Sequence, residues 1–230
     1  MNGSLYLCAM IVANMNLHEV YEVLKDETPK LIWKRDSLYS KAIKELRKCF
    51  EYPACVIYDY KIPSSNNQYI IYFYHQNPFA DVLAGILLVL YDGNKRFVIQ
   101  WTEGNKPEIH ILTSHFLKRY KERFLNQPEL TANEVAVRFI SRNNKIRPIN
   151  VNERINKHIE KYGEYANEGF LVNDGFCFKL TGEEYMEGEE QPIGISFYTT
   201  FMPLTEMSDS QLDAICEEVV KDLKDLDFSI

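Results

Sequence analysis

The chain has 230 residues, of which 46% are apolar and 26% are charged, and its formal net charge is −7. These proportions are ordinary for a globular protein with a full core, and they exclude collagen-like, coiled-coil and fully disordered classes. The sequence holds no apolar run of the roughly 20 residues that a membrane-spanning helix needs, so we expect neither a membrane span nor a membrane partner.

The first predicted elements are two helices. Apolar residues at helical spacing predict a helix over residues 16–26, which Pro29 ends because proline lacks the backbone N–H that a helix interior requires. A second helix is predicted over residues 36–50, with Asp36 or Ser37 as its N-cap.

The hydrophobic period then changes to two, which is typical of strands. Turn clusters rich in Gly, Asn and Asp separate short apolar segments. Connections this short force antiparallel neighbours, because a parallel crossover needs a dozen residues or more. The predicted strands of this first run are residues 54–61, 68–75, 87–91, 96–101 and 107–112.

The middle of the chain is predicted to be helical and the last third to return to strands. Thr131 and Glu134 form a capping box at the start of the second middle helix. The predicted helices cover residues 114–126, residues 131–141, a segment from Asn150 or Asn152 to Tyr162, and residues 209–226. The predicted strands cover residues 170–173, 176–180 and 193–202, the first two joined by a turn at Asp174-Gly175.

This order of elements predicts an α+β fold: a mostly antiparallel sheet with an N-terminal helical segment, a central helical insertion and a C-terminal helix. No flexible linker divides the chain, so residues 1–230 are predicted to form a single domain, with a split near residues 141–150 as the alternative. We expect the two strand runs to join one sheet, with the last helix packed on it through its apolar stripe.

The cysteines predict a reducing, cytoplasmic compartment. Their number is odd and no pair forms a C-x-x-C pattern, so all of them are expected to be free thiols. No Cys and His side chains stand at the spacing of zinc ligands, so neither a metal nor a cofactor is expected. The cysteines are Cys8, Cys49, Cys55, Cys177 and Cys216.

Two further segments have alternative interpretations. Residues 5–13 resemble the apolar part of a signal peptide, but no Lys or Arg precedes them, so a buried strand or helix is favoured; Met15 is an alternative start. The glutamate-rich residues 182–191 do not match an EF-hand loop, so we predict a solvated and mobile acidic loop instead of a calcium site.

Charge is distributed unevenly along the chain. Residues 95–161 hold 14 basic and 7 acidic side chains, whereas residues 162–230 hold 3 basic and 16 acidic ones. The basic middle predicts contact with RNA or another anionic ligand. The alternatives are that the acidic last third folds against it, or that it meets the acidic third of a second copy in a homodimer.

Common catalytic motifs are absent, including a Walker loop, G-x-G-x-x-G after a strand, H-E-x-x-H and G-x-S-x-G. The remaining candidate is His115-x-x-x-Arg119-x-x-x-Arg123, whose side chains form a stripe beside the buried face of a helix at about 100° per residue. An acid/base group next to fixed cations suits phosphodiester cleavage. The alternative is that the arginines pair with acidic side chains, and Glu122 with Lys118.

A strand that leads into Thr-x-His-x-x-x-Arg-x-x-x-Arg, within residues 113–124, resembles the His/Arg helix of the barnase/RelE-like ribonuclease superfamily. The resemblance implies an antiparallel sheet joined to helices and RNA cleavage without a metal. In those families the helix usually precedes the sheet, whereas here a run of strands precedes the helix. The implied catalytic residues are His115, Arg119 and Arg123, with a hydroxyl from Thr199 or Thr200 on the late strand.

These observations favour a non-catalytic binding or interaction domain, and they leave open whether the protein is an enzyme. The alternative is a metal-independent ribonuclease-like or phosphate-binding domain that uses the His/Arg helix. An enzyme is expected to hold His115 and an arginine in a concave site with a hydroxyl or carboxylate from another element. An interaction domain is expected to show them on a convex face, paired with Glu or Asp.

Overall fold

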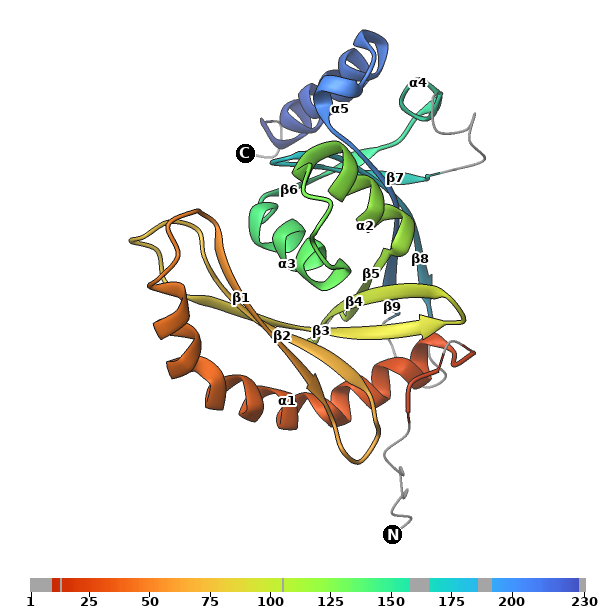
Figure 1. Ribbon diagram of the computed structural model, residues 1–230. Helices are drawn as coiled ribbons and strands as arrows, with labels where there is room; N and C mark the ends of the chain where they lie inside the picture. Colours follow the sequence, from red (N-terminus) through yellow and green to blue (C-terminus); the bar gives the residue numbers. More distant parts are fainter. Residues whose placement is uncertain (1–9, 13, 105, 158–165, 186–191, 228–230) are drawn as a thin grey trace.

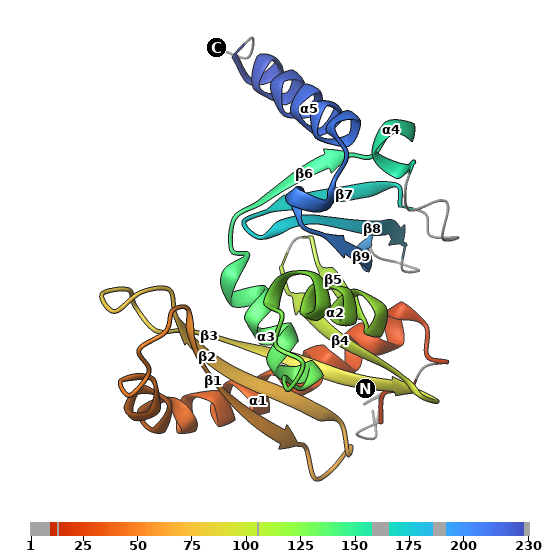
Figure 2. The same cartoon turned by 45° about the horizontal axis from the view of Figure 1, so that its top comes forward.

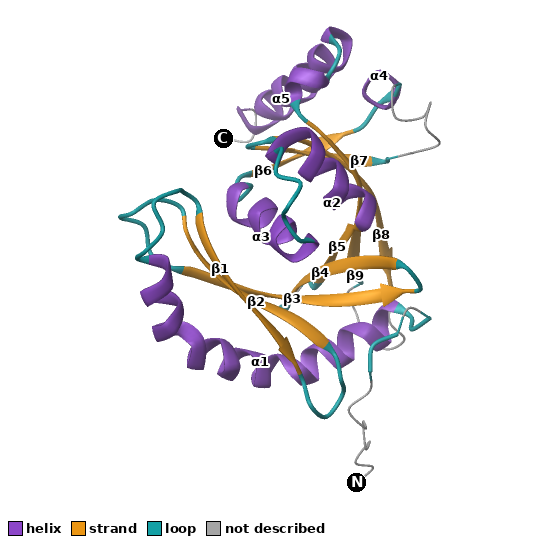
Figure 3. Ribbon diagram, in the orientation of Figure 1, coloured by secondary structure: helices purple, strands orange, loops and turns teal. Residues whose placement is uncertain are grey.

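Figure 1 shows the computed structural model, which describes residues 10–12, 14–104, 106–157, 166–185 and 192–227. The helices are α1 (Leu17–Leu46), α2 (Ser114–Tyr120), α3 (Ala132–Arg142), α4 (Glu153–Asn156) and α5 (Asp209–Asp227). The strands are β1 (Ala54–Lys61), β2 (Gln68–His75), β3 (Leu83–Asp92), β4 (Lys95–Thr102), β5 (Glu108–Thr113), β6 (Ile146–Asn150), β7 (Glu168–Val172), β8 (Gly175–Glu184) and β9 (Ile193–Met202). Figure 3 colours both kinds of element.

The nine strands form one sheet in the order β1-β2-β3-β4-β5-β9-β8-β7-β6. Neighbouring strands are antiparallel except β5 and β9, which run parallel and join the two strand runs. The predicted α+β class, with a mostly antiparallel sheet, is therefore confirmed, and so is the expectation that both runs enter a single sheet.

Helices cover both faces of this curved sheet (Figure 1). The long helix α1 lies along the outer face of the first strands, where Leu24, Leu31 and Tyr69 belong to one buried cluster. Helices α2 and α3 pack on the opposite face, where Phe116 and Val137 are fully buried. Helix α5 packs near the far end of the sheet beside α4 and β6 (Figure 2). None of the described helices is long and apolar enough to cross a lipid bilayer.

The prediction that Pro29 separates two helices is wrong, because α1 continues through it. Asn16 caps the start of α1 in a capping box. The buried apolar stripe of α1 continues on both sides of the proline, from Leu24 to Leu31. Proline removes one backbone hydrogen bond and bends a helix, at a cost of about 3 kcal/mol. Burial of the continuous apolar stripe offsets that cost, and α1 follows the curve of the sheet (Figure 1).

Two other elements in the second half of the chain differ from what the sequence predicted. Strand β6 was not predicted, because it contains Pro148 and is mostly exposed at the edge of the sheet. The predicted helix that ends at Tyr162 is described only as α4, one turn capped by Asn152, and residues 158–165 lie outside the described residues.

The acidic loop predicted at residues 182–191 is shorter than expected. Residues 182–184 continue β8 and pair with β9, because their backbone extends the hairpin ladder despite the acidic side chains. Residues 186–191, on which the mobility prediction chiefly falls, lie outside the described residues.

Candidate functional site

The candidate stripe lies on α2 and the π-helical turn that follows it at Lys121–Leu125. Thr113 caps α2: its hydroxyl accepts a hydrogen bond from the N–H of Phe116 at 3.1 Å and donates one to the carbonyl of Tyr198 at 2.8 Å. The helix buries Phe116 and Tyr120 against the sheet and leaves His115 exposed. Local sequence thus places the stripe at the protein surface.

Both arginines of the stripe have carboxylate partners. Arg119 lies 3.8 Å from Glu122, and its Nε donates to Nε2 of His115 at 3.4 Å. Arg123 lies 3.5 Å from Glu206, and its Nη1 donates to the carbonyl of Phe201 at 3.1 Å. Arg123 therefore ties the helix to the end of β9, while Arg119 stays within the turn of its own helix.

Thr200 is not brought to this stripe. It is buried opposite Phe178 in the β8–β9 ladder, and Phe178 belongs to the cluster that packs against α5. The neighbouring Cys177 points to the other face, into the cluster that contains Phe116 of α2. The hydroxyl of Thr199 donates to the carbonyl of Phe178 at 3.1 Å. Neither threonine hydroxyl is thus placed as the resemblance implies.

Ion pairs join the basic middle of the chain to its acidic last third. Besides the pair between Arg123 and Glu206, Arg142 contacts Asp174 at 2.9 Å and Arg154 contacts Glu217 at 2.7 Å. These contacts agree with the alternative in which the acidic third folds against the basic middle, and they place part of the opposite charge within one chain.

A buried polar cluster surrounds Asp174, whose side chain is only 5% exposed. Arg142 donates to both carboxylate oxygens, at 2.9 and 3.0 Å, and the hydroxyl of Tyr120 donates to Oδ2 at 2.6 Å. The side-chain amide of Asn143 donates to the same oxygen at 3.0 Å. Because these donors come from α2, from α3 and from the residue after α3, the cluster ties the β7–β8 turn to both helices.

The pKa values in this cluster reflect its burial and pairing. Hydrogen bonding to Asp174 is the main cause that raises the pKa of the Arg142 guanidinium. Burial is the main cause that raises the pKa of Tyr120, and the nearby carboxylate adds to it. The sequence indicated Asp174 only as the first residue of a predicted hairpin turn, and its role depends on the side chains of Arg142 and Tyr120, which are 32 and 54 positions away.

Metal binding finds no support in the described part of the chain, where no group of three or more His, Cys, Asp and Glu side chains gathers. His110 contacts Glu108 at 3.1 Å. Burial lowers the pKa of His110. This effect is larger than that of Glu108, which raises the same pKa.

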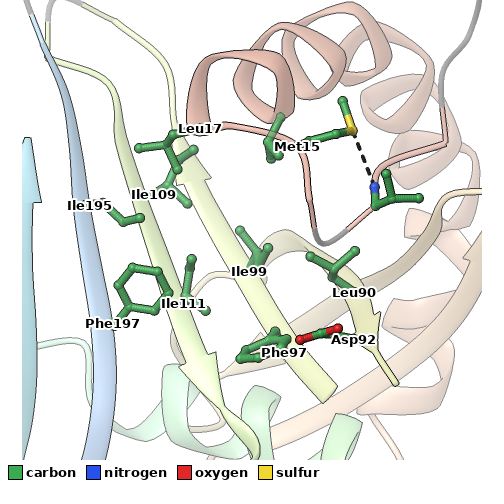
Figure 4. Close-up of a pocket in the computed structure, with 12 residues that line it drawn as sticks. Met15, Leu17, Leu90, Asp92, Phe97, Ile99, Ile109, Ile111, Ile195 and Phe197 are labelled. Atoms are coloured by element: carbon green, nitrogen blue, oxygen red, sulfur yellow. Dashed lines mark hydrogen bonds between the residues drawn. The ribbon is translucent and has the colours of Figure 1, made fainter. Parts of the chain in front are cut away.

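The described chain holds an apolar pocket of about 300 Å³ beneath the first turns of α1 (Figure 4). Its floor comes from β3, β4, β5 and β9, and its wall from α1 and the segment before it, where the N–H of Val12 contacts Sδ of Met15 at 3.4 Å. Asp92 is the single charged residue in the lining. The lining consists of Val12, Met15, Leu17, Val20, Leu90, Asp92, Phe97, Ile99, Ile109, Ile111, Ile195 and Phe197.

Sequence reasoning missed this pocket. Alternation did identify apolar strand faces such as Ile109 and Ile111, or Ile195 and Phe197. What places them side by side is the parallel pairing of β5 with β9, in which Ile111 lies opposite Phe197. That pairing joins residues more than 80 positions apart, and no local pattern indicates it.

Comparisons of this chain with protein-family models, with curated proteins and with solved structures found no match.

Proposed function

We propose that this protein is a non-catalytic binding domain that holds a small apolar molecule in the pocket beneath α1. The observation that carries the proposal is the lining, in which Asp92 stands alone among apolar side chains. Ligand pockets of proteins measure about 300–1,000 Å³ and are mostly apolar, with few polar groups that orient the ligand. A pocket of about 300 Å³ suits a compact ligand with an apolar body.

The same lining argues for binding and against catalysis. It contains no His, Ser, Thr, Cys or Lys, so it offers neither a nucleophile nor a general base beyond the Asp92 carboxylate. Cys49, Cys55, Cys177 and Cys216 are free thiols, which suits the reducing cytoplasmic compartment that we propose for the protein.

Filling the pocket is expected to abolish ligand binding. Ile195→Trp adds a large side chain to the pocket lining. If this side chain excludes a ligand group the size of a Phe ring, the binding free energy weakens by about 1.5–3 kcal/mol, and the affinity falls roughly tenfold to more than a hundredfold. The measurement is the fluorescence of the neutral dye N-phenyl-1-naphthylamine, and its displacement by decylamine, whose cationic end suits Asp92, with the folded protein.

The matched control is Ile146→Trp, the same change at a half-exposed position on the edge strand β6. It is expected to keep the affinity of the unchanged protein. Equal dye binding by both variants and the original chain would show that the dye sits elsewhere and would remove the proposed pocket function.

An anion-binding surface for RNA or phosphate is the second candidate function. It is favoured by one specific contact, the Arg119 Nε that donates to Nε2 of the exposed His115. A guanidinium beside an imidazole ring suits a phosphate group, in keeping with the resemblance to the ribonuclease helix. Lys118, at 67% side-chain exposure, adds a further cation.

Two arginine variants separate this candidate from a structural role. Arg119→Ala is expected to change the free energy of unfolding by less than about 1 kcal/mol, because its ion pair is exposed. Arg123→Ala is expected to cost about 1–3 kcal/mol, because it leaves the Phe201 carbonyl and Glu206 without their donor. Thermal melting and the binding of a short single-stranded RNA are measured on both variants. Unchanged RNA binding in Arg119→Ala would eliminate the anion site.

A further inference from the structure

Two phenylalanine rings stand almost entirely in solvent at one end of the sheet. Phe50 is 93% exposed in the connection from α1 to β1, and Phe79 is 97% exposed in the connection from β2 to β3. Ala54 at the start of β1 pairs with His75 at the end of β2, so both connections leave the sheet at the same end (Figures 1 and 2). We call the end that carries Phe50, Tyr52, Phe79 and Leu83 the aromatic tip; Tyr52 and Leu83 are exposed as well.

Basic side chains flank the aromatic tip on two sides. The end of α1 supplies three exposed cations there, and none of the described ion pairs includes them. The end of α3 is held at the same place, because Sγ of Cys55 contacts the hydroxyl of Ser141 at 3.2 Å and the Gln76 amide donates to the Ser141 carbonyl. The flanking cations are Lys44, Arg47 and Lys48 from α1, and Arg138 and Lys145 from the region of α3.

Negative charge is sparser at this end. The connections carry the carboxylates of Glu51 and Asp81, and the end of α1 adds Glu45, which pairs with Lys41 at 3.7 Å; the five cations outnumber them. The tip is therefore locally positive although the whole chain is acidic. An apolar centre inside a basic rim is the pattern of a surface that inserts rings among lipid acyl chains and attracts anionic headgroups.

We propose that the aromatic tip docks onto an anionic lipid surface. The exposure of the two rings favours lipid over nucleic acid. Each ring is almost completely solvent-exposed on its connection, so lipid can surround it. A surface that stacks nucleic-acid bases instead presents its rings along a groove that follows the nucleic-acid backbone. The sequence-based expectation of no membrane partner rested on the lack of a spanning segment, and docking through two loops requires none. The site is separate from the pocket beneath α1: Leu83 of the tip and Leu90 of the pocket lining lie seven residues apart on β3, which is roughly 23 Å along the strand.

The test is co-sedimentation of the full chain with vesicles of phosphatidylcholine alone and of phosphatidylcholine mixed with phosphatidylserine. We expect binding to the mixed vesicles that weakens as salt rises. The double variant Phe50→Ser/Phe79→Ser is expected to lose affinity by about tenfold or more. Arg47→Glu/Lys48→Glu is expected to lose binding to the mixed vesicles as well.

The matched control is Trp33→Ser, which removes a 72% exposed aromatic ring from the middle of α1. It is expected to bind vesicles like the original chain, and all variants are expected to keep the same melting temperature, because exposed rings leave no cavity. Failure of the original chain to bind mixed vesicles, or an equal loss in Trp33→Ser, would overturn the proposal. So would a double Phe variant that loses binding to single-stranded RNA while its vesicle binding is unchanged.

Discussion

The protein is expected to unfold within about one to three pH units above pH 10, because four tyrosine hydroxyls are buried. Burial is the main cause that raises the pKa of Tyr69, Tyr72, Tyr120 and Tyr198 above the ordinary tyrosine value of about 10. All four side chains are at most 4% exposed. Ionisation of any of them therefore requires the chain to open.

The direction of this effect follows from proton binding in the two states. Above pH 10 the unfolded chain loses the four protons and the folded chain keeps them, so stability falls as pH rises. Each tyrosine contributes a slope of about 1.4 kcal/mol per pH unit, or roughly 5 kcal/mol per unit for the four together. Domains are stable by about 5–15 kcal/mol, so this loss suffices to unfold the protein. Below pH 10 the contribution is fully present.

Circular dichroism and tyrosinate absorbance, followed together during alkaline titration, check this prediction. The absorbance of the buried tyrosines should rise with the loss of helix signal. Tyr72→Phe is the matched variant, because it removes one ionisable hydroxyl from a buried ring. It should lower the pH dependence by about 1.4 kcal/mol per unit. Complete ionisation near pH 10 with an unchanged helix signal would contradict the burial of these hydroxyls.

Much of the fold could be predicted because local patterns and tertiary packing agree. Alternation predicted the observed bounds of β1 and β9, and an apolar run between turn signals predicted those of β2. The capping box of Thr131 and Glu134 begins α3 as expected, and a hairpin turn joins β7 to β8 one residue earlier than predicted, at Asn173-Asp174, because Val172 pairs with Gly175. In each case the signal lies within a few residues of the element that it specifies.

The errors have a common physical cause, since each depends on contacts distant in the sequence. Pro29 is a strong local signal against a helix, yet the sheet beneath α1 buries the apolar stripe on both sides of it. Strand β3 begins at Leu83, earlier than predicted, because Leu83 pairs with Tyr74 of β2 even though its own side chain is exposed. Strand β6 forms because β7 offers it a partner.

The candidate sites divide in the same way. The stripe of His115, Arg119 and Arg123 was visible because it lies on one helix. The contacts of Arg123 with Phe201 and Glu206 could not be predicted from the sequence. The apolar pocket and the aromatic tip each combine segments brought together only by strand pairing, so no window of the sequence contains them.

Removing the Asp174 carboxylate is expected to destabilise the protein by about 2–4 kcal/mol, since two core donors lose their acceptor while the Arg142 guanidinium left behind is 33% exposed. In Asp174→Ala the guanidinium of Arg142 loses two acceptors, and the hydroxyl of Tyr120 loses its acceptor inside the core. The β7–β8 turn loses its link to α2 and α3 at the same time. The measurement is the free energy of unfolding in urea at neutral pH.

Glu217→Ala supplies the matched control, because it breaks the pair between Arg154 and Glu217, which has the same chemistry and a comparable distance of 2.7 Å. The two pairs differ mainly in the exposure of the carboxylate: the Arg154 and Glu217 side chains are 43% and 64% exposed, whereas those of Arg142 and Asp174 are 33% and 5% exposed. Water screens the exposed pair, so its loss is expected to cost less than about 1 kcal/mol. Equal costs for the two variants would mean that the cluster around Asp174 is open to water, and the assignment of a structural role to it would fail.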